Sequence, residues 1–212
     1  LGLETSFIDG MRITDEKTMD VVQMVLGGIV NQEIVSLINE NGGKAVGLTG
    51  KDANLIEAKK FLLEKQKAEM GIAKPIDIGQ VGEVTKINQQ IIDVVTNTGF
   101  IPVVAPIGVG KDNKTYNINA DLVAGKIAEK LGAEKLVLLT NVSGIRNAKD
   151  ELISRLMPKE AERLIKEGDI KEGMIPKVQC AISAVQNGVK KRTLLMGFRS
   201  TRYFWRCSQT RE

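Results

Sequence analysis

The sequence contains no histidine, only two cysteines and no long uninterrupted apolar run. Without histidine, and with Cys180 and Cys207 far apart in the chain, we expect no Cys/His metal site. Cys180 is interpreted as a small buried apolar side chain. No signal peptide and no apolar run of about 20 residues is visible, so we expect a reducing, cytoplasmic setting and no membrane partner.

An excess of one charge is also missing from most of the chain. The formal charge of +4 comes from residues 192–212, where five arginines outweigh one glutamate, whereas residues 1–191 carry 25 basic and 25 acidic groups. Four of the eight aromatic residues lie in the same C-terminal segment. Interleaved basic and aromatic residues are typical of nucleic-acid binding when they belong to the fold. Because the composition changes abruptly at residue 192, we interpret residues 192–212 as an aberrant tail and expect no nucleic-acid partner.

What the sequence does contain is an alternation of apolar, strand-like runs with helical patterns. This alternation predicts an α/β fold, a three-layer αβα sandwich with a mainly parallel sheet, in one domain over residues 1–191. Helices are expected from Thr14 or Asp15 to Gly42, from Asn88 to Asn97, from Asn119 or Ala120 to about Gly132, over 158–167 and over 173–187. Strands are expected over 44–49, 81–87, 100–107 and 135–140, with a turn over 108–114 and a hairpin or lid within 51–74.

The first group of candidate site residues lies in the segment Tyr116–Asp121, between a short extended piece and a helix start. If the segment is extended, Asn117 and Asn119 point the same way and can hydrogen-bond an anionic or amide-bearing ligand. Asp121 can then orient cationic groups. The alternative is structural, because asparagine and aspartate are also preferred helix caps and turn formers.

Three further segments carry residues suited to anions. Arg12 stands in a glycine-containing loop, and arginine recognises carboxylates with two parallel hydrogen bonds. Lys177 lies in the first turn of a predicted helix, where the helix N-terminus and the lysine charge together suit a transferring phosphoryl group. A solvated lysine is the alternative there. The strand over 135–140 runs into a loop of small residues, and ligands bind beyond the carboxyl ends of parallel strands, although a tight turn has the same composition.

Together and in this order, these segments resemble acetylglutamate kinases of the amino-acid kinase family. The resemblance covers about residues 1–191 and involves seven ordered motifs: Gly10–Met19, Val30–Ile34, Gly42–Asp52, Val81–Val84, Ile101–Ile107, Tyr116–Asp121 and Gly173–Val178. It implies transfer of the γ-phosphoryl group of ATP to the side-chain carboxylate of N-acetyl-L-glutamate, which gives an acyl phosphate in arginine biosynthesis. It also implies Mg²⁺ held mainly by the nucleotide, no metal site made by the protein, and a homo-oligomer in the full-length enzyme.

The resemblance also implies roles for individual residues. Arg12 matches the residue that binds the substrate α-carboxylate, and Asn117, with Asn119 close by, matches the asparagine that holds the substrate. Asp121 matches the aspartate that organises the catalytic lysines, and Lys177 matches the lysine that stabilises charge on the transferring phosphoryl group. The ATP loop corresponds to Thr140, Asn141, Val142, Ser143, Gly144 and Ile145, although many family members carry aspartate at the position of Asn141. Residues 1–115 would then be the substrate-binding lobe and residues 116–191 the nucleotide-binding lobe.

Both ends of the sequence depart from the family pattern. Before the equivalent of Leu1 the family has a strand with a phosphate-binding lysine and a His-Gly-Gly-Gly loop. We therefore expect the first strand to be missing and this exact chain to have negligible activity. After Lys191 the family has a strand similar to Ala-His-Ile-Ile-Asp-Gly, which permitted codons for residues 191–197 encode after a one-base shift. We interpret residues 192–212 as out of frame, and a stop codon in the alternative frame before the position of Glu212 would contradict this.

Three other functions stay open at this point. One is phosphorylation of N-acetyl-aminoadipate, a substrate that is longer by one methylene and needs a deeper pocket. The second is a non-catalytic fragment that binds a nucleotide or another ligand without turnover. The third is nucleic-acid binding, which would require salt-dependent affinity from residues 1–191 rather than from the tail alone.

Overall fold

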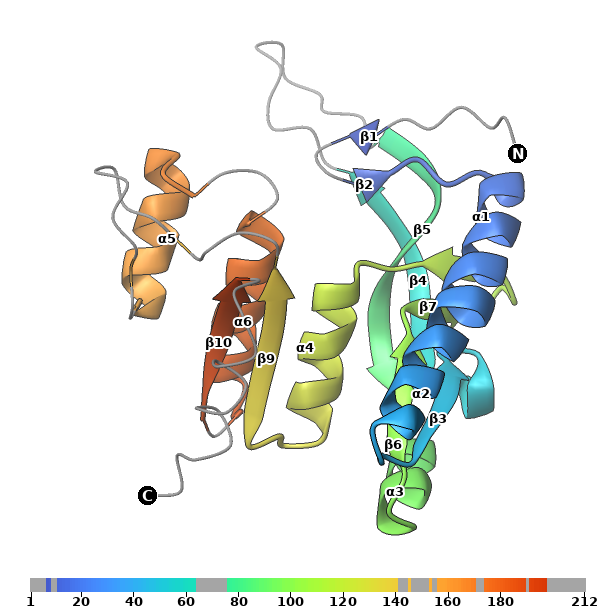
Figure 1. Cartoon of the computed structure of the whole chain (residues 1–212). Helices are drawn as coiled ribbons and strands as arrows, with labels where there is room; N and C mark the ends of the chain where they lie inside the picture. The colour runs from blue at the N-terminus through green and yellow to red at the C-terminus, as the bar shows by residue number, and fades with distance from the viewer. Residues whose placement is uncertain are drawn as a thin grey trace. The chain divides into compact units, whose positions relative to one another are not determined.

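The computed structural model describes residues 7–8, 11–63, 76–140, 145, 153, 156–170, 174–189 and 191–197 (Figure 1). By internal contacts the chain forms two compact units, Leu1–Leu131 and Gly132–Glu212. The combination of helices with parallel strand pairs confirms the α/β class that the sequence predicts. The two-lobe division near residue 115 stays a prediction, because lobes of this kind are defined by the ligand that each one binds.

In the first unit a short strand pair is followed by a long helix that packs on a parallel pair of strands. Its helical elements and strands, in chain order, are β1 (Phe7–Ile8), β2 (Met11–Arg12), α1 (Glu16–Val22), the π-helix η1 (Gln23–Val30), α2 (Asn31–Glu40) and β3 (Ala45–Thr49). The Asp15 carboxylate accepts a hydrogen bond from the Thr18 N–H at 2.7 Å, so Asp15 rather than Thr14 caps the helix. The buried Asn31 donates its side-chain amide to the carbonyl oxygens of Val103 (2.9 Å) and Leu48 (3.3 Å). These two bonds hold the middle of the helix against β3 and the later strand β6 (Ile101–Ala105), which pair in parallel.

The remainder of the first unit contains a small closed barrel that the sequence did not predict. Its elements are η2 (Asp52–Asn54), β4 (Ile56–Leu63), β5 (Ile76–Ile87), α3 (Gln90–Asn97), β6 (Ile101–Ala105), β7 (Ile107–Gly110), β8 (Thr115–Asn117) and α4 (Ala120–Lys130). The barrel order is β4-β5-β8-β7, with β4 also paired to β7. Its core contains Leu55, Ile56, Ala58, Ile87, Ile92, Tyr116, Ile118 and Val123. The expected hairpin is real, since β4 and β5 are antiparallel, but it extends to Ile87.

The apolar run over residues 100–107 is two strands and not the single central strand expected. β6 ends at Ala105 and β7 begins at Ile107, in a different sheet. Pro106 separates them because proline has no N–H to donate to a ladder, while its carbonyl oxygen accepts from the Ile118 N–H at 3.1 Å. The predicted turn over 108–114 is therefore shorter, since β7 continues to Gly110.

The second unit consists of a parallel strand pair and two helices. β9 (Lys135–Thr140) pairs with β10 (Lys191–Gly197), and α6 (Ile175–Gln186) contacts both strands (Figure 1). α5 (Pro158–Glu167) has the bounds that the sequence predicts, with Pro158 at its start and Gly168 after its end. The apolar core of this unit contains Ala161, Leu164, Ile170 and Val178. β9 also has its predicted bounds, whereas β10 was not predicted, because all of it except Lys191 lies in residues 192–212, which we interpreted from the sequence as an aberrant tail.

Candidate active site

Asn117 is joined to the Arg12 segment by a buried threonine. Thr14 has no exposed surface, and its hydroxyl donates to the carbonyl oxygen of Arg12 at 3.0 Å. The side-chain amide of Asn117 in turn donates to the Thr14 hydroxyl at 3.4 Å. Two residues that the sequence assigns to one substrate site therefore belong to segments connected by a continuous chain of hydrogen bonds, although 105 positions separate them in the sequence.

Asn119 has the structural role that the sequence left open. Its side-chain oxygen accepts hydrogen bonds from the backbone N–H groups of Asp121 (2.9 Å) and Leu122 (3.2 Å), so it is the N-cap of α4. A contact with substrate would thus use its Nδ2 group. Asp121 is half-buried in the first turn of α4, where a negative charge is favoured by the helix dipole.

Lys177 is half-buried in the first turn of α6, directly after Pro176. Its helix is anchored by Val178, which is buried and donates its N–H to the carbonyl oxygen of Met174 at 3.0 Å. Gly173, which the sequence places at the helix start, lies outside the described residues. Because Asp121 belongs to the first unit and Lys177 to the second, the pairing expected between them stays a prediction.

The expected ATP loop is described only at its ends. Thr140 is the last residue of β9, and residues 141–144 lie outside the described part of the chain. Ile145 is partly buried against the core of the second unit, and its carbonyl oxygen accepts from the Ile153 N–H at 2.8 Å. Ile145 is therefore part of the packing of this unit, whatever contact its loop makes with a nucleotide.

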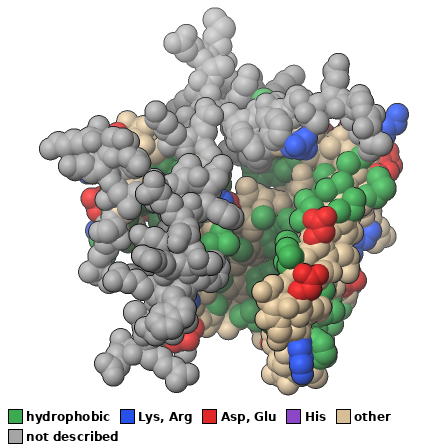
Figure 2. Space-filling view, in the orientation of Figure 1, with side chains coloured by type: hydrophobic (Ala, Val, Ile, Leu, Met, Phe, Trp, Pro, Cys, Tyr) green, Lys and Arg blue, Asp and Glu red, His purple; other side chains and the backbone are tan. Residues whose placement is uncertain are grey.

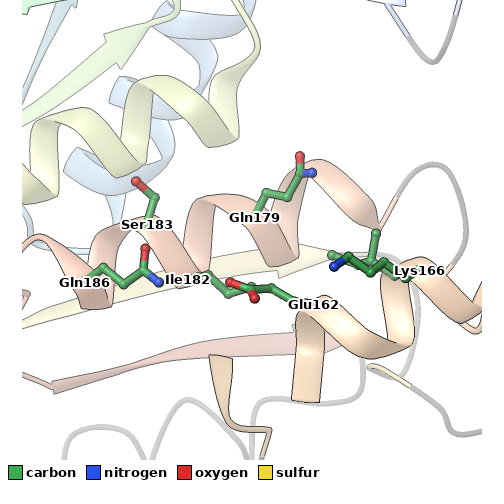
Figure 3. Close-up of a pocket in the computed structure, with 7 residues that line it drawn as sticks. Glu162, Lys166, Gln179, Ile182, Ser183 and Gln186 are labelled. Carbon is green, nitrogen blue, oxygen red and sulfur yellow. The ribbon is translucent and has the colours of Figure 1, made fainter. Parts of the chain in front are cut away.

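A groove in the second unit lies between α5 and α6 (Figure 3). It has a volume of about 330 Å³ and is lined by Glu162, Ile165, Lys166, Gln179, Ile182, Ser183 and Gln186. Lys177 is on the same helix but is not one of the lining residues. None of the residues predicted for the site lines this groove, so it does not identify the active site.

Sequence reasoning missed a pair beside Asn117, in which the buried Tyr116 bonds to the exposed Asp112. The Tyr116 hydroxyl donates to the Asp112 carboxylate at 2.8 Å across the β7–β8 turn, and the side chain of Tyr116 is in the barrel core. Burial, and then the bond to Asp112, raises the pKa of Tyr116 to about 12. The same bond lowers the pKa of Asp112. The only signal in the sequence was a tyrosine four residues after an aspartate in a turn, which is too common to be diagnostic.

This pair predicts how stability depends on alkaline pH. The unfolded chain loses the Tyr116 proton near pH 10.0, whereas the folded chain keeps it until about pH 12. Stability from this group is thus fully present below pH 10 and is lost as the pH rises toward 12. Replacing Asp112 with Asn should lower the phenol pKa, measured by ultraviolet absorbance during alkaline titration. Tyr116→Phe identifies which phase belongs to Tyr116, and an unchanged midpoint in Asp112→Asn would contradict the assignment.

Comparison with known proteins gives matches over most of the chain. Residues 1–194 match the model of the amino acid kinase family. The chain is 56% identical over 197 residues to an acetylglutamate kinase of Saccharophagus degradans, covering 93% of this chain and 66% of that protein. It is also 56% identical to an acetylglutamate kinase of Acinetobacter baumannii, covering 93% of this chain and 65% of that one. The chain thus spans about two thirds of the length of the curated relatives it matches.

Solved structures show the same relationship at the level of the fold. The crystal structure of smu.665 from Streptococcus mutans is similar with a TM-score of 0.78 and 27% identity, covering 92% of this chain and 74% of that one. An N-acetylglutamate synthase from Neisseria gonorrhoeae has a TM-score of 0.75 at 23% identity, covering 92% of this chain and 42% of that one. With the family match over nearly the whole length, the chain belongs to the amino acid kinase family.

Proposed function

We propose that the chain represents an acetylglutamate kinase, which transfers the γ-phosphoryl group of ATP to the side-chain carboxylate of N-acetyl-L-glutamate. The observation that carries this proposal is the connection between Arg12 and Asn117 through Thr14, because it joins a carboxylate-binding residue type to an amide donor. The 56% identity to named acetylglutamate kinases supports the choice of substrate within the family. The product would be an acyl phosphate that enters arginine biosynthesis.

The chemistry requires positioning and charge neutralisation more than proton transfer. The substrate carboxylate is already a nucleophile, so no general base is needed and the absence of histidine is no obstacle. Arg12 would hold the α-carboxylate, Asn117 the substrate amide, and Lys177 the charge on the transferring phosphoryl group. Asp121 would orient the lysine. The residues Thr140–Ile145 would contact the nucleotide beyond the carboxyl end of β9.

Mg²⁺ fits this arrangement as an ion held mainly by the nucleotide. Within the described residues, no three His, Cys, Asp or Glu side chains lie together as a metal site. Magnesium commonly keeps several waters and is bound through substrate phosphates with one or two carboxylates. When bound with ATP it would neutralise phosphate charge.

Two measurements test this function. First, calorimetric titration of the chain with N-acetyl-L-glutamate should show binding that Arg12→Ala weakens at least about tenfold, as expected for a lost bidentate pair.

Second, turnover is measured in a chimera, in which the Saccharophagus degradans relative supplies the part of its length that this chain does not span. ADP release that depends on N-acetyl-L-glutamate supports the kinase. Preference for N-acetyl-L-aminoadipate would favour the longer substrate, and binding without turnover would favour a ligand-binding protein.

We also propose that a second copy of the chain covers the long helix of the first unit. Apolar side chains are exposed along it, including Met24 (57%), Ile29 (58%) and Leu37 (58%), and Figure 2 shows such side chains running along this helix. By length and composition the helix Glu16–Glu40 could also cross a membrane, although it contains no uninterrupted apolar run of that length. The bonds of Asn31 hold this helix on β3 and β6, so the helix is packed within the unit. We therefore favour a second copy over a membrane as the partner of its exposed face.

Sedimentation measures this association directly. Ile29→Asp should reduce the sedimenting mass to half that of the wild-type assembly or less, because a buried charge opposes an apolar interface. Val94→Asp changes a side chain of similar exposure (56%) on α3 and should leave the mass unchanged. A monomeric wild-type chain would contradict the proposal.

A further inference from the structure

Thr14 has hydrogen-bond partners for both its main chain and its side chain. Its N–H donates to the carbonyl oxygen of Ile78 at 3.0 Å, and its own carbonyl oxygen accepts from the Gln80 N–H. Its hydroxyl bonds to the Arg12 carbonyl oxygen and to the Asn117 side-chain amide. Both the backbone and the side chain of this one buried residue therefore have partners, on three different segments.

The strand β5 sets the distance between the Arg12 segment and Asn117. Thr14 forms a parallel bridge with Gly79, and Asn117 pairs in parallel with Val81. The two partners are two positions apart on β5, which corresponds to about 7 Å along a strand. Because strand pairing fixes both contacts, neither segment can slide along β5 without breaking main-chain hydrogen bonds.

Gly79 makes this close approach possible. Its φ is +82°, and a Cβ atom there would overlap the carbonyl oxygen and carbon of Thr14. Glycine inside a strand commonly marks a place where another piece of backbone comes near, and here that piece is the Thr14 peptide. Any side chain at position 79 would push the Arg12 segment away from β5.

We propose that Thr14 and Gly79 are positioning residues that fix the separation of Arg12 and Asn117, and with it the binding of the α-carboxylate and the amide, which are both attached to the α-carbon of the ligand. This inference rests on the proposed function for the identity of the ligand. Neither residue needs to touch the substrate. Thr14 acts through the Asn117 amide, whose direction it sets, and through the backbone of Arg12. Gly79 acts by leaving room for Thr14.

Variants of Thr14 separate the hydroxyl from the shape of the side chain. Thr14→Val keeps the shape but removes both hydroxyl bonds, whereas Thr14→Ser keeps the hydroxyl. We expect Thr14→Val to weaken N-acetyl-L-glutamate binding about tenfold, from the loss of a buried hydrogen-bond partner. Binding of N-acetyl-L-aminoadipate should weaken by a similar factor, because it carries the same groups on its α-carbon. Thr14→Ser should stay within about twofold of the wild-type affinity for both ligands.

Variants of glycine provide a matched control. Gly79 and Gly99 have nearly the same φ, +82° and +81°, but a Cβ at Gly99 meets nothing within 4 Å. Alanine is therefore strained by a similar amount at both positions, but only at position 79 does it displace Thr14. Gly79→Ala should weaken ligand binding, while Gly99→Ala should leave it unchanged. Equal ligand binding by the two alanine variants would overturn the inference.

An NMR measurement keeps the inference separate from the proposed function. The side-chain amide signal of Asn117, assigned through Asn117→Ser, should move in Thr14→Val and Gly79→Ala and stay in place in Thr14→Ser and Gly99→Ala. If the wild-type chain does not bind N-acetyl-L-glutamate, the proposed function fails and this signal alone decides the positioning role. An unmoved signal in Thr14→Val overturns it. Should Thr14→Val not fold, Gly79→Ala carries the same comparison.

Discussion

Replacing Lys177 with alanine is expected to lower kcat of the chimera with its Saccharophagus degradans relative by at least about a hundredfold, with a smaller change in the KM for N-acetyl-L-glutamate. The reason is that a cation aimed at the transferring phosphoryl group stabilises charge that develops in the transition state more than in the ground state. Lys177 is suited to this by its place in the first turn of α6, where the helix dipole adds to its charge. The measurement is the steady-state rate of ADP release.

Lys159 is the matched control for this experiment. It also follows a proline at the start of a helix in the second unit, but its side chain is exposed. Lys159→Ala should therefore leave kcat unchanged within about twofold, because a solvated charge contributes little. Wild-type turnover in Lys177→Ala would remove Lys177 from the mechanism. A loss of similar size in both variants would point to a general effect of positive charge.

Replacing Ile56 with alanine is expected to destabilise the first unit by about 2–5 kcal/mol. Ile56 has no exposed surface and lies in the core shared by the barrel, α3 and α4. Truncation removes buried apolar contacts and leaves a cavity, which close-packed neighbours fill only in part. The substrate site belongs to the same unit through Thr14 and Asn117, so ligand binding should weaken as the unfolded fraction grows.

Leu62 offers the control within the same strand. It is 46% exposed on β4, so Leu62→Ala should cost about 1 kcal/mol or less. Native-state hydrogen exchange of the β4 and β5 amides reports the stability of this unit by itself, which a global unfolding curve of a chain with two units does not. Similar losses of protection in the two variants would show that Ile56 is not central to the core.

The sequence was most informative where one strong local signal coincided with one element. The apolar run of β9 and the helical pattern over 158–167 gave the observed bounds, since both are local signals, although Val137 and Leu139 on one face of β9 are exposed. The barrel was not predictable in the same way. Its closure depends on pairing between residues far apart in the chain, such as Val81 with Asn117. A break at one residue, Pro106, sufficed to place Ile107, the last residue of a predicted strand, in another sheet.

The candidate site shows the same limit. Arg12, Asn117 and Lys177 were selected by residue type and by the order of motifs, which needs no coordinates. A helix-capping role for Asn119 was also considered from the sequence. The hydrogen bonds from the N–H groups of Asp121 and Leu122 show that Asn119 has this role. Thr14 was considered only as a helix cap, because its contact with Asn117 arises from tertiary packing. Such contacts follow from strand register, which local patterns do not determine.

The bond between Asn117 and Thr14 spans 103 positions of the chain, and this separation governs when the site can form. During synthesis the Arg12 segment leaves the ribosome long before its partners on β5 and β8. Contacts of this sequence separation form late, because the entropy of closing the loop opposes them until the intervening strands are in place. Substrate binding then reports completed folding of the first unit, and a nascent chain that stops before Asn117 contains Arg12 without a site.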